Sequence, residues 1–315
     1  MRLLADIGGT NVRFALLPDG ATEPQQERSL LCADFRGLED AARHYLVEVG
    51  NPSVREGAID VATAVTGDLI KLTNSPWAFS IEQTRRQLGL DRLLVLNDFT
   101  ALALSLPVLR AEELRQIGRG EPVGDKPVGL IGPGTGLGVS GLLPTANRWI
   151  PLEGEGGHVA FSPMDDREDG VLRLLRARFG HVSTERVVSG PGLVNVYEAL
   201  CQLDHVPVRG LQPHQVTAAG LANSDPQAEE ALAMFCAVLG TAAANLTITL
   251  GARGGLYIGG GIVPKLGDYF GRSAFRARFE DKGRFSAYLA GVPTYVIETD
   301  NPALRGLAAA IGAQS

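Results

Sequence analysis

Two glycine-rich segments of the chain contain the residue types that bind phosphate. The first follows the apolar run 3–5 and reads Asp6, Ile7, Gly8, Gly9, Thr10 and Asn11. The second follows the apolar run 128–131 and has at its centre Gly134, Thr135 and Gly136. Glycine allows positive φ and lets backbone N–H groups approach an anion closely, and a carboxylate such as that of Asp6 can hold Mg²⁺ beside phosphates. Two such loops in one chain predict a nucleotide held between two related halves.

A polar pair, Asn97 and Asp98, follows the apolar run 93–96 and precedes a helical segment. Ligands of α/β proteins gather at the carboxyl ends of strands, so this pair is a candidate for binding and catalysis. A side chain at this place can also cap the following helix. Taken alone, Asp98 fits either role.

Further polar residues occur near glycines in the second half of the chain. Glu155 and His158 have two glycines between them, which disfavours a metal-binding helix and favours a loop suited to hydroxyl recognition. A purely structural histidine fits the same pattern. Glu185 precedes a helical segment, where an acidic residue stabilises the helix dipole or is simply solvated. None of these residues indicates a function by itself.

A third glycine cluster includes Gly260 and Gly261 and lies between an apolar run and a helical segment. It predicts either close backbone packing or a flat surface on which a purine could lie.

The elements that must position these residues alternate between strands and helices, which predicts α/β layers. Strands are expected at 3–7, 12–17, 57–64, 93–96, 256–258 and 294–297. Helices are expected at 38–49, 100–106, 170–179, 192–203, 227–250 (one helix or two), from 264 onward and at 301–312. The polar, breaker-rich residues 118–122, at the end of a charged stretch 110–126, indicate a linker.

Composition restricts the class of protein. A chain of 315 residues usually forms two domains, and the formal net charge of −6 with no Lys/Arg-rich run argues against nucleic-acid binding. Three scattered cysteines without a C-x-x-C pattern fit a reducing compartment and no structural zinc. We expect a cytoplasmic protein, because no signal peptide is visible and the apolar stretch 238–250 looks too short and too polar to cross a membrane.

The ordered set of these motifs resembles the bacterial glucokinases of the actin/hexokinase-type ATPase superfamily. The matching segments are 6–11, 96–100, 134–138, 154–158, 185–192, 259–264 and 279–285. Each motif is weak alone, but together they cover nearly the whole chain in the family's order.

The resemblance implies an α/β, two-domain, actin-like (ribonuclease-H-like) ATPase fold with a cleft between the domains. The small domain would comprise 1–108 plus 301–315 and the large domain 109–300. It also implies a homodimer that transfers the γ-phosphoryl group of MgATP to the C6 hydroxyl of glucose, with no nucleic-acid or membrane partner.

The same resemblance implies roles for the candidate residues. Asn97 and Asp98 would bind sugar hydroxyls, with Asp98 as the catalytic base. Glu155, His158 and Glu185 would surround the anomeric side of the sugar. The two phosphate loops would take the ATP phosphates, with Asp6 placing Mg²⁺ through water, and Gly260 and Gly261 would lie near the adenosine.

One sequence difference separates this chain from the related ROK group. Sugar kinases and repressors of the related ROK group follow Glu-x-Gly-His with a zinc-binding cysteine cluster, whereas here the next cysteine after His158 is Cys201. The chain therefore resembles the zinc-free branch. Two alternatives remain: a kinase for mannose, fructose or an N-acetylhexosamine, and a sugar-sensing repressor. The repressor would need a DNA-binding module, for which a first loop beginning at residue 6 leaves no room.

Overall fold

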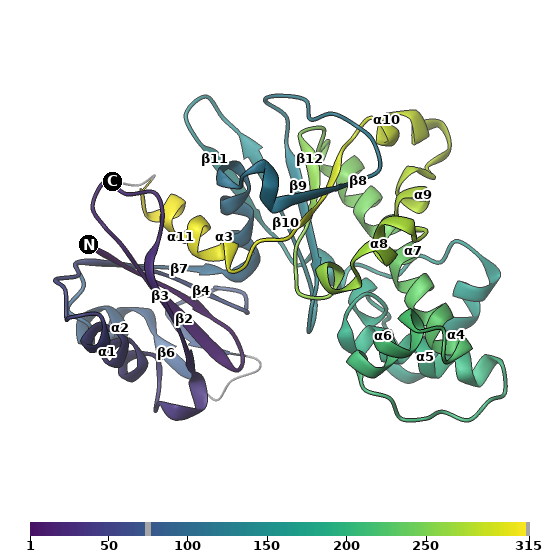
Figure 1. The fold of residues 1–315 in the computed structure, drawn as a ribbon, viewed down its shortest axis with the longest axis horizontal. Coiled ribbons are helices and arrows are strands. Elements are labelled where there is room, and N and C mark those ends of the chain that lie inside the picture. The colour runs from purple at the N-terminus through teal and green to yellow at the C-terminus, as the bar shows by residue number, and fades with distance from the viewer. Residues whose placement is uncertain (73–76, 313–315) are drawn as a thin grey trace. The chain divides into compact units, whose positions relative to one another are not determined.

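The structure, a computed structural model, describes residues 1–72 and 77–312. The predicted α/β architecture is confirmed, with helices packed on two large sheets (Figure 1). The chain divides into two compact units, each described here by itself. The first unit consists of Met1–Ala111, Asn147–Glu153 and Thr299–Ser315, and the second of Glu112–Ala146 and Gly154–Glu298.

The first sheet places several strand ends at one edge. Its order is β3-β2-β1-β4-β7, with β1 and β2 joined as an antiparallel hairpin around the first glycine loop and β4 and β7 parallel to β1. The strands are β1 (Arg2–Ile7), β2 (Asn11–Leu17), β3 (Gln25–Leu31), β4 (Glu56–Val61) and β7 (Arg92–Asn97). Because β1, β4 and β7 run in one direction, their carboxyl ends meet at the same edge.

The second sheet repeats this arrangement and adds a strand. Its order is β11-β10-β9-β12-β13-β8, in which β9 and β10 form a hairpin around the second glycine loop and β12 and β13 run parallel to β9. The strands are β9 (Val128–Pro133), β10 (Leu137–Pro144), β11 (Trp149–Glu153), β12 (Gly255–Ile258), β13 (Thr294–Ile297) and β8 (Leu114–Ile117). The two halves are thus related in topology as well as in loop type.

Strand β8 was missed in the sequence, because it lies within the charged stretch 110–126 and has no apolar alternation. It is held at the sheet edge by antiparallel pairing with β13 and by an ion pair of 2.5 Å between Arg115 Nε and Glu298 Oε1.

Helices cover the sheets in both units. The first unit has α1 (Leu38–Glu48), α2 (Ile81–Gln87), α3 (Asp98–Ser105) and α11 (Pro302–Gly312), with a small hairpin of β5 (Leu69–Lys71) and β6 (Ala78–Ser80). The second has α4 (Asp166–Phe179), α5 (Gly190–Leu203), α6 (Pro213–Leu221), α7 (Pro226–Leu250), α8 (Asp268–Arg272), α9 (Phe275–Glu280) and α10 (Ser286–Ala290). The helix expected from residue 264 onward begins instead as a 3₁₀ turn, Val263–Leu266.

Helix α7 is the central helix of the second unit. It is one helix of 25 residues, started by the Asp225 side chain and ended by Gly251 at φ 62°. The apolar stretch 238–250 is part of this longer helix, which by length and composition is long and apolar enough to cross a membrane. However, 72% of its most apolar window is buried inside the protein, against neighbours that include α5, α6 and α9. We therefore assign it as a core helix.

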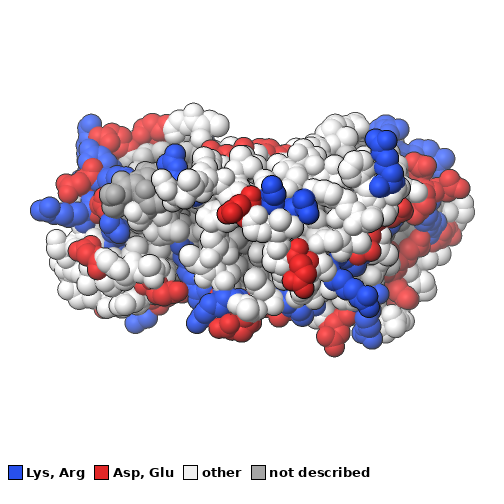
Figure 2. Space-filling view, turned by 90° about the horizontal axis from the view of Figure 1, so that it is seen from above, with Lys and Arg blue, Asp and Glu red and all other residues white. Residues whose placement is uncertain are grey.

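Charged side chains of both signs are mixed on the surface. On the face drawn in Figure 2, Lys and Arg are interspersed with Asp and Glu and do not gather into a basic strip. A nucleic-acid-binding face would concentrate positive charge.

In the first unit, α11 crosses α3 at a point where only glycine fits. A Cβ atom on Gly306 would overlap the backbone carbonyl oxygen of Ala101. The absence of a side chain therefore allows the two helices to approach closely.

We predict that Gly306→Ala destabilises the protein by about 1–3 kcal/mol, because the added methyl group forces the two helix backbones apart. Gly312→Ala in the same helix is the matched control, since a Cβ there meets no atom of the described residues within 4 Å. Urea unfolding measures both variants. Equal stability of the two would contradict the close crossing.

Candidate active site

Three carboxylates gather at the carboxyl edge of the first sheet. Asp6 lies near the end of β1, and it is in register with Asp60 on the neighbouring strand β4. Asp98 follows β7, the next strand of the sheet, and is the first residue of α3. The structure thus brings the predicted residues Asp6 and Asp98 to one edge, together with Asp60, which the sequence analysis missed.

Asp60 is completely buried, and neither of its carboxyl oxygens has a hydrogen-bond donor among the described residues. Burial, together with the charges of Asp6 and Asp98, raises the pKa of Asp60 well above its usual range. The Asp60 carboxyl can hydrogen-bond to Asp6 only by keeping its proton and donating it. A charged residue inside the otherwise apolar strand was the signal in the sequence.

Asp6, unlike Asp60, forms an ion pair with a basic side chain. An ion pair of 2.9 Å joins its Oδ2 to Nη1 of Arg13, which lies opposite it on β2. Arg13 is therefore the counter-ion of Asp6 at this strand end.

Asn97 and Asp98 divide the two roles that the sequence left open. Asn97 is the N-cap of α3, and its Oδ1 accepts hydrogen bonds from the N–H groups of Phe99 (2.9 Å) and Thr100 (3.3 Å). Asp98 Oδ1 also accepts from Phe99 N, at 2.9 Å. Burial raises the pKa of Asp98 to about 6, and the nearby Asp6 charge acts in the same direction. The helix cap is therefore Asn97, while Asp98 is a carboxylate that titrates near neutral pH.

The first glycine loop is a tight hairpin turn. Gly8 N–H donates to the Asn11 carbonyl at 2.9 Å, and Gly9 and Thr10 at its tip are exposed. The expected positive φ does not occur at Gly8; a Cβ there would lie 3.2 Å from the Asn11 oxygen. Glycine is needed at this position for close backbone contact. Ile7 is buried at the end of β1 and anchors the turn to the core.

The second glycine loop is built in the same way. Gly134 N–H donates to the Gly136 carbonyl at 2.8 Å, and Thr135 at the tip is exposed. Neither glycine has positive φ. A Cβ on Gly136 would lie 2.5 Å from Oε2 of Glu185, and that oxygen accepts a 2.9 Å hydrogen bond from Leu137 N–H. The structure thus brings Glu185, predicted at the sugar, beside the phosphate loop.

The third glycine cluster lies against the second loop, because β12 pairs with β9. Gly260 has φ 77°, and a Cβ on it would overlap the Pro133 carbonyl oxygen. A Cβ on Gly261 would meet no atom within 4 Å. Gly260 therefore provides the close packing, and Gly261 leaves an open backbone surface.

Glu155 and His158 lie on opposite ends of a single 3₁₀ turn, Gly156–His158, rather than on an irregular loop. Both side chains are exposed. A Cβ on Gly157 would overlap the Leu137 carbonyl oxygen, so this glycine lets the turn pack against β10. Thr184 N–H donates to the Val159 carbonyl at 2.8 Å, which ties this turn to the segment that carries Glu185. Glu155, His158 and Glu185 are thus positioned together within the second unit.

We predict that Asp60→Asn stabilises the protein at pH 8, by an amount that shrinks toward pH 4. Below its unfolded pKa, Asp60 is protonated in both states. As pH rises, the unfolded chain releases this proton while the folded protein retains it, so wild-type stability falls. The asparagine side chain of the variant has no proton to release, and its amide can donate to Asp6. Guanidinium unfolding between pH 4 and 8 measures the difference, with the exposed Asp91→Asn as control. A gain that does not depend on pH would refute the retained proton.

Comparison with known proteins identifies the family of this chain. A family model described as Glucokinase matches residues 3–314. A glucokinase from Chromobacterium violaceum is 55% identical over 311 residues, which cover 98% of this chain and 88% of that protein. The crystal structure of a glucokinase from an Antarctic psychrotroph is 34% identical, covers 99% of this chain and 98% of its own, and superposes with a TM-score of 0.90.

A more distant solved structure supports the fold alone. The ROK family glucokinase of Streptomyces griseus, in complex with glucose and AMPPNP, is 20% identical and covers 99% of this chain and 100% of its own, with a TM-score of 0.63. The match to the family model and the identity to the Chromobacterium enzyme agree over nearly the whole chain. This chain therefore belongs to the glucokinase family, whose activity is the ATP-dependent phosphorylation of glucose.

Proposed function

We propose that Asp98 is the general base with which this glucokinase transfers the γ-phosphoryl group of ATP to the C6 hydroxyl of glucose. The observation that carries the proposal is the position of Asp98 at the end of β7, where burial raises its pKa to about 6. A base is most effective when its pKa lies near the working pH, since it is then ionised and still holds a proton well.

The chemistry needs positioning and charge stabilisation more than covalent catalysis, because the transition state of phosphoryl transfer is loose. Asp98 would accept a hydrogen bond from the C6 hydroxyl and take its proton as the oxygen attacks phosphorus. The Phe99 N–H holds Oδ1 of Asp98, so Oδ2 is the atom that we assign to the proton.

The remaining sugar contacts follow from which polar atoms are already in use. The cap occupies Asn97 Oδ1, and the Thr63 carbonyl accepts one N–H of its amide at 3.4 Å, so the second N–H would donate to a hydroxyl. The Leu137 N–H occupies Oε2 of Glu185, which leaves Oε1 to accept one. Glu155 and His158 are exposed on their 3₁₀ turn and would bind the anomeric side.

The phosphates of ATP would bind at the tips of the two hairpin turns, where Gly9, Thr10 and Thr135 are exposed. Backbone N–H groups in such turns stabilise anionic oxygens. The adenosine would lie near Gly261, whose open backbone offers a flat surface.

Magnesium would enter with ATP as part of the substrate, where it neutralises phosphate charge. Among the described residues, no group of three or more His, Cys, Asp or Glu side chains is arranged to hold a metal ion. Asp6 has one oxygen paired with Arg13, so it fits a role in orienting the magnesium ion through water.

We also propose that the protein is a homodimer in the cytoplasm. Its three cysteines, Cys32, Cys201 and Cys236, are buried free thiols, which suits a reducing compartment.

We predict that Asp98→Asn lowers kcat by about 10²–10⁴-fold while glucose still binds, because asparagine keeps the shape of aspartate but cannot take a proton. The wild-type kcat/KM should rise with pH through about 6 and level off above it, since only the ionised carboxylate is active. A coupled ADP-release assay measures both. The control is Asp91→Asn, which lies just before β7 and should retain activity. A fall of less than tenfold for Asp98→Asn would mean that Asp98 is structural.

Glucose should be preferred over its C2 epimer mannose when kcat/KM is compared at saturating MgATP. Glu185, with Oε1 free, accepts an equatorial C2 hydroxyl in this proposal, and an unpaired buried acceptor costs about 1–3 kcal/mol. Glu185→Gln should reduce the preference while keeping an acceptor for Leu137 N–H. Equal values for both sugars in the wild type would favour a broad hexokinase. A preference that survives Glu185→Gln would remove Glu185 from this role.

A further inference from the structure

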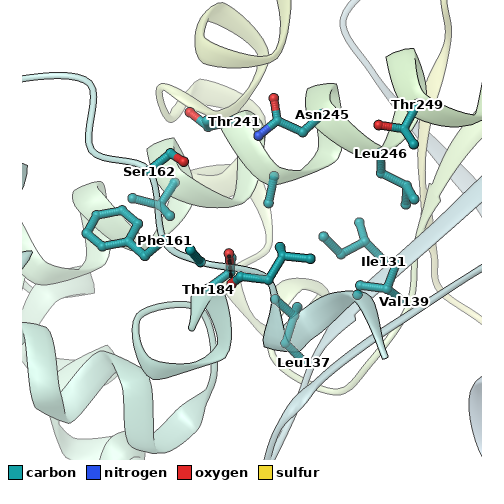
Figure 3. A pocket seen from close by; sticks show the side chains of 15 residues that line it. Ile131, Leu137, Val139, Phe161, Ser162, Thr184, Thr241, Asn245, Leu246 and Thr249 are labelled. Atoms are coloured by element: carbon teal, nitrogen blue, oxygen red, sulfur yellow. Dashed lines mark hydrogen bonds between the residues drawn. The ribbon is translucent and has the colours of Figure 1, made fainter. Parts of the chain in front are cut away.

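The second unit contains a cavity of about 240 Å³ that the proposed reaction does not use (Figure 3). Its walls are formed by the two strands that flank the second phosphate loop, the segment 156–162 after Glu155, Thr184 and helix α7. In Figure 3, Thr241, Asn245 and Thr249 follow one another along α7 and lie across the cavity from Leu137 and Thr184. The cavity opens to solvent at Val159 and Asn245, both of which are exposed.

The lining indicates which chemistry the cavity can take. Among the described residues that line it, none is charged, and most are aliphatic. The polar groups at its edge are hydroxyls and one amide, that of Asn245, which has no hydrogen bond to any described residue. Ligand sites commonly combine an apolar lining with a few neutral polar groups that fix orientation. Arg278, which donates to Thr241 Oγ1 at 3.1 Å, is already paired with Glu168, so a charged ligand would find no counter-ion among the described lining residues.

The walls of the cavity and the proposed sugar site share the same short segments. Gly156 and Val159 line the cavity and flank His158, and Thr184 lines it and precedes Glu185. Leu137 also lines it, while its N–H holds Glu185 Oε2 at 2.9 Å. A molecule in the cavity would contact the backs of the segments whose other side carries the sugar-binding residues.

We propose that this cavity binds a small, uncharged, mainly apolar molecule with one hydrogen-bonding group, and that filling it strengthens glucose binding. The second part rests on the proposed roles of Glu155, His158 and Glu185. The reason for the direction is the glycine content of the segment 154–157, which makes its ordering costly. A ligand packed against Gly156 and Val159 meets part of that cost before the sugar arrives, which gives positive coupling.

Indole is a suitable probe, because it is uncharged, mainly apolar and has one N–H donor. Saturation-transfer NMR on the full-length protein should detect its binding. Ala242→Phe, which fills the cavity from α7, should weaken indole binding at least tenfold. Val159→Trp, at the exposed mouth, provides a second block if the first variant fails to fold. Val208→Trp is the control, since Val208 is similarly exposed and does not line the cavity.

Coupling is measured by titrating glucose calorimetrically with and without saturating indole. We expect indole to lower the glucose Kd about fivefold, and glucose to lower the indole Kd by the same factor. No indole binding, or binding that both blocking variants leave unchanged, would overturn the site. An unchanged glucose Kd in the presence of bound indole would overturn the coupling. Failure of the protein to bind glucose without indole would instead count against the proposed function, and the indole result would stand separately.

Discussion

Three carboxyl groups cannot all keep their charge at one buried strand end, and the arrangement of the first unit follows from this constraint. Parallel pairing of β1, β4 and β7 places Asp6, Asp60 and Asp98 at the same edge of the sheet. An ion pair joins Asp6 to Arg13, and burial raises the pKa of Asp60 well above its usual range. Burial also raises the pKa of Asp98, to about 6. Three residues of one type thus have three different surroundings at one strand edge.

The second unit depends on backbone contacts that only glycine permits. Gly157 lets the turn with Glu155 and His158 pack on β10, and Gly260 lets the third glycine cluster pack on Pro133. These contacts place the candidate binding groups beside the strands of the second sheet. The cavity beside α7 adjoins these contacts, and its walls include residues next to the candidate sugar residues, namely Gly156, Val159 and Thr184.

The sequence predicted most elements whose burial produces a clear hydrophobic pattern. The hairpin of β1 and β2, strand β13 and the long helix α7 are examples. Strands β3 and β8 have no such pattern, because β3 is mostly exposed and β8 is polar; pairing with a neighbour holds them, and a single sequence does not reveal partners.

In the candidate site, too, the sequence predicted some features and not those that depend on spatial neighbours. Residue types and the family resemblance supplied its members, but not their local roles. The cap was found to be Asn97, and Gly8 and Gly136 of the two phosphate loops serve close approach where positive φ was expected. Asp60 was visible in the sequence as a charged residue within a strand, but its register with Asp6 across the sheet was not. Protonation states depend on such neighbours, which lie far apart in the chain.

The central claim is that Asp98 is a carboxylate whose pKa the fold has raised into the range of a useful base. The most direct test is a ¹³C NMR titration of the aspartate carboxyl carbons, with the Asp98 signal assigned by its loss in Asp98→Asn. We expect a midpoint of about 6 for this signal in the sugar-free protein. A midpoint near 4, the ordinary value of a solvated aspartate, would contradict the claim.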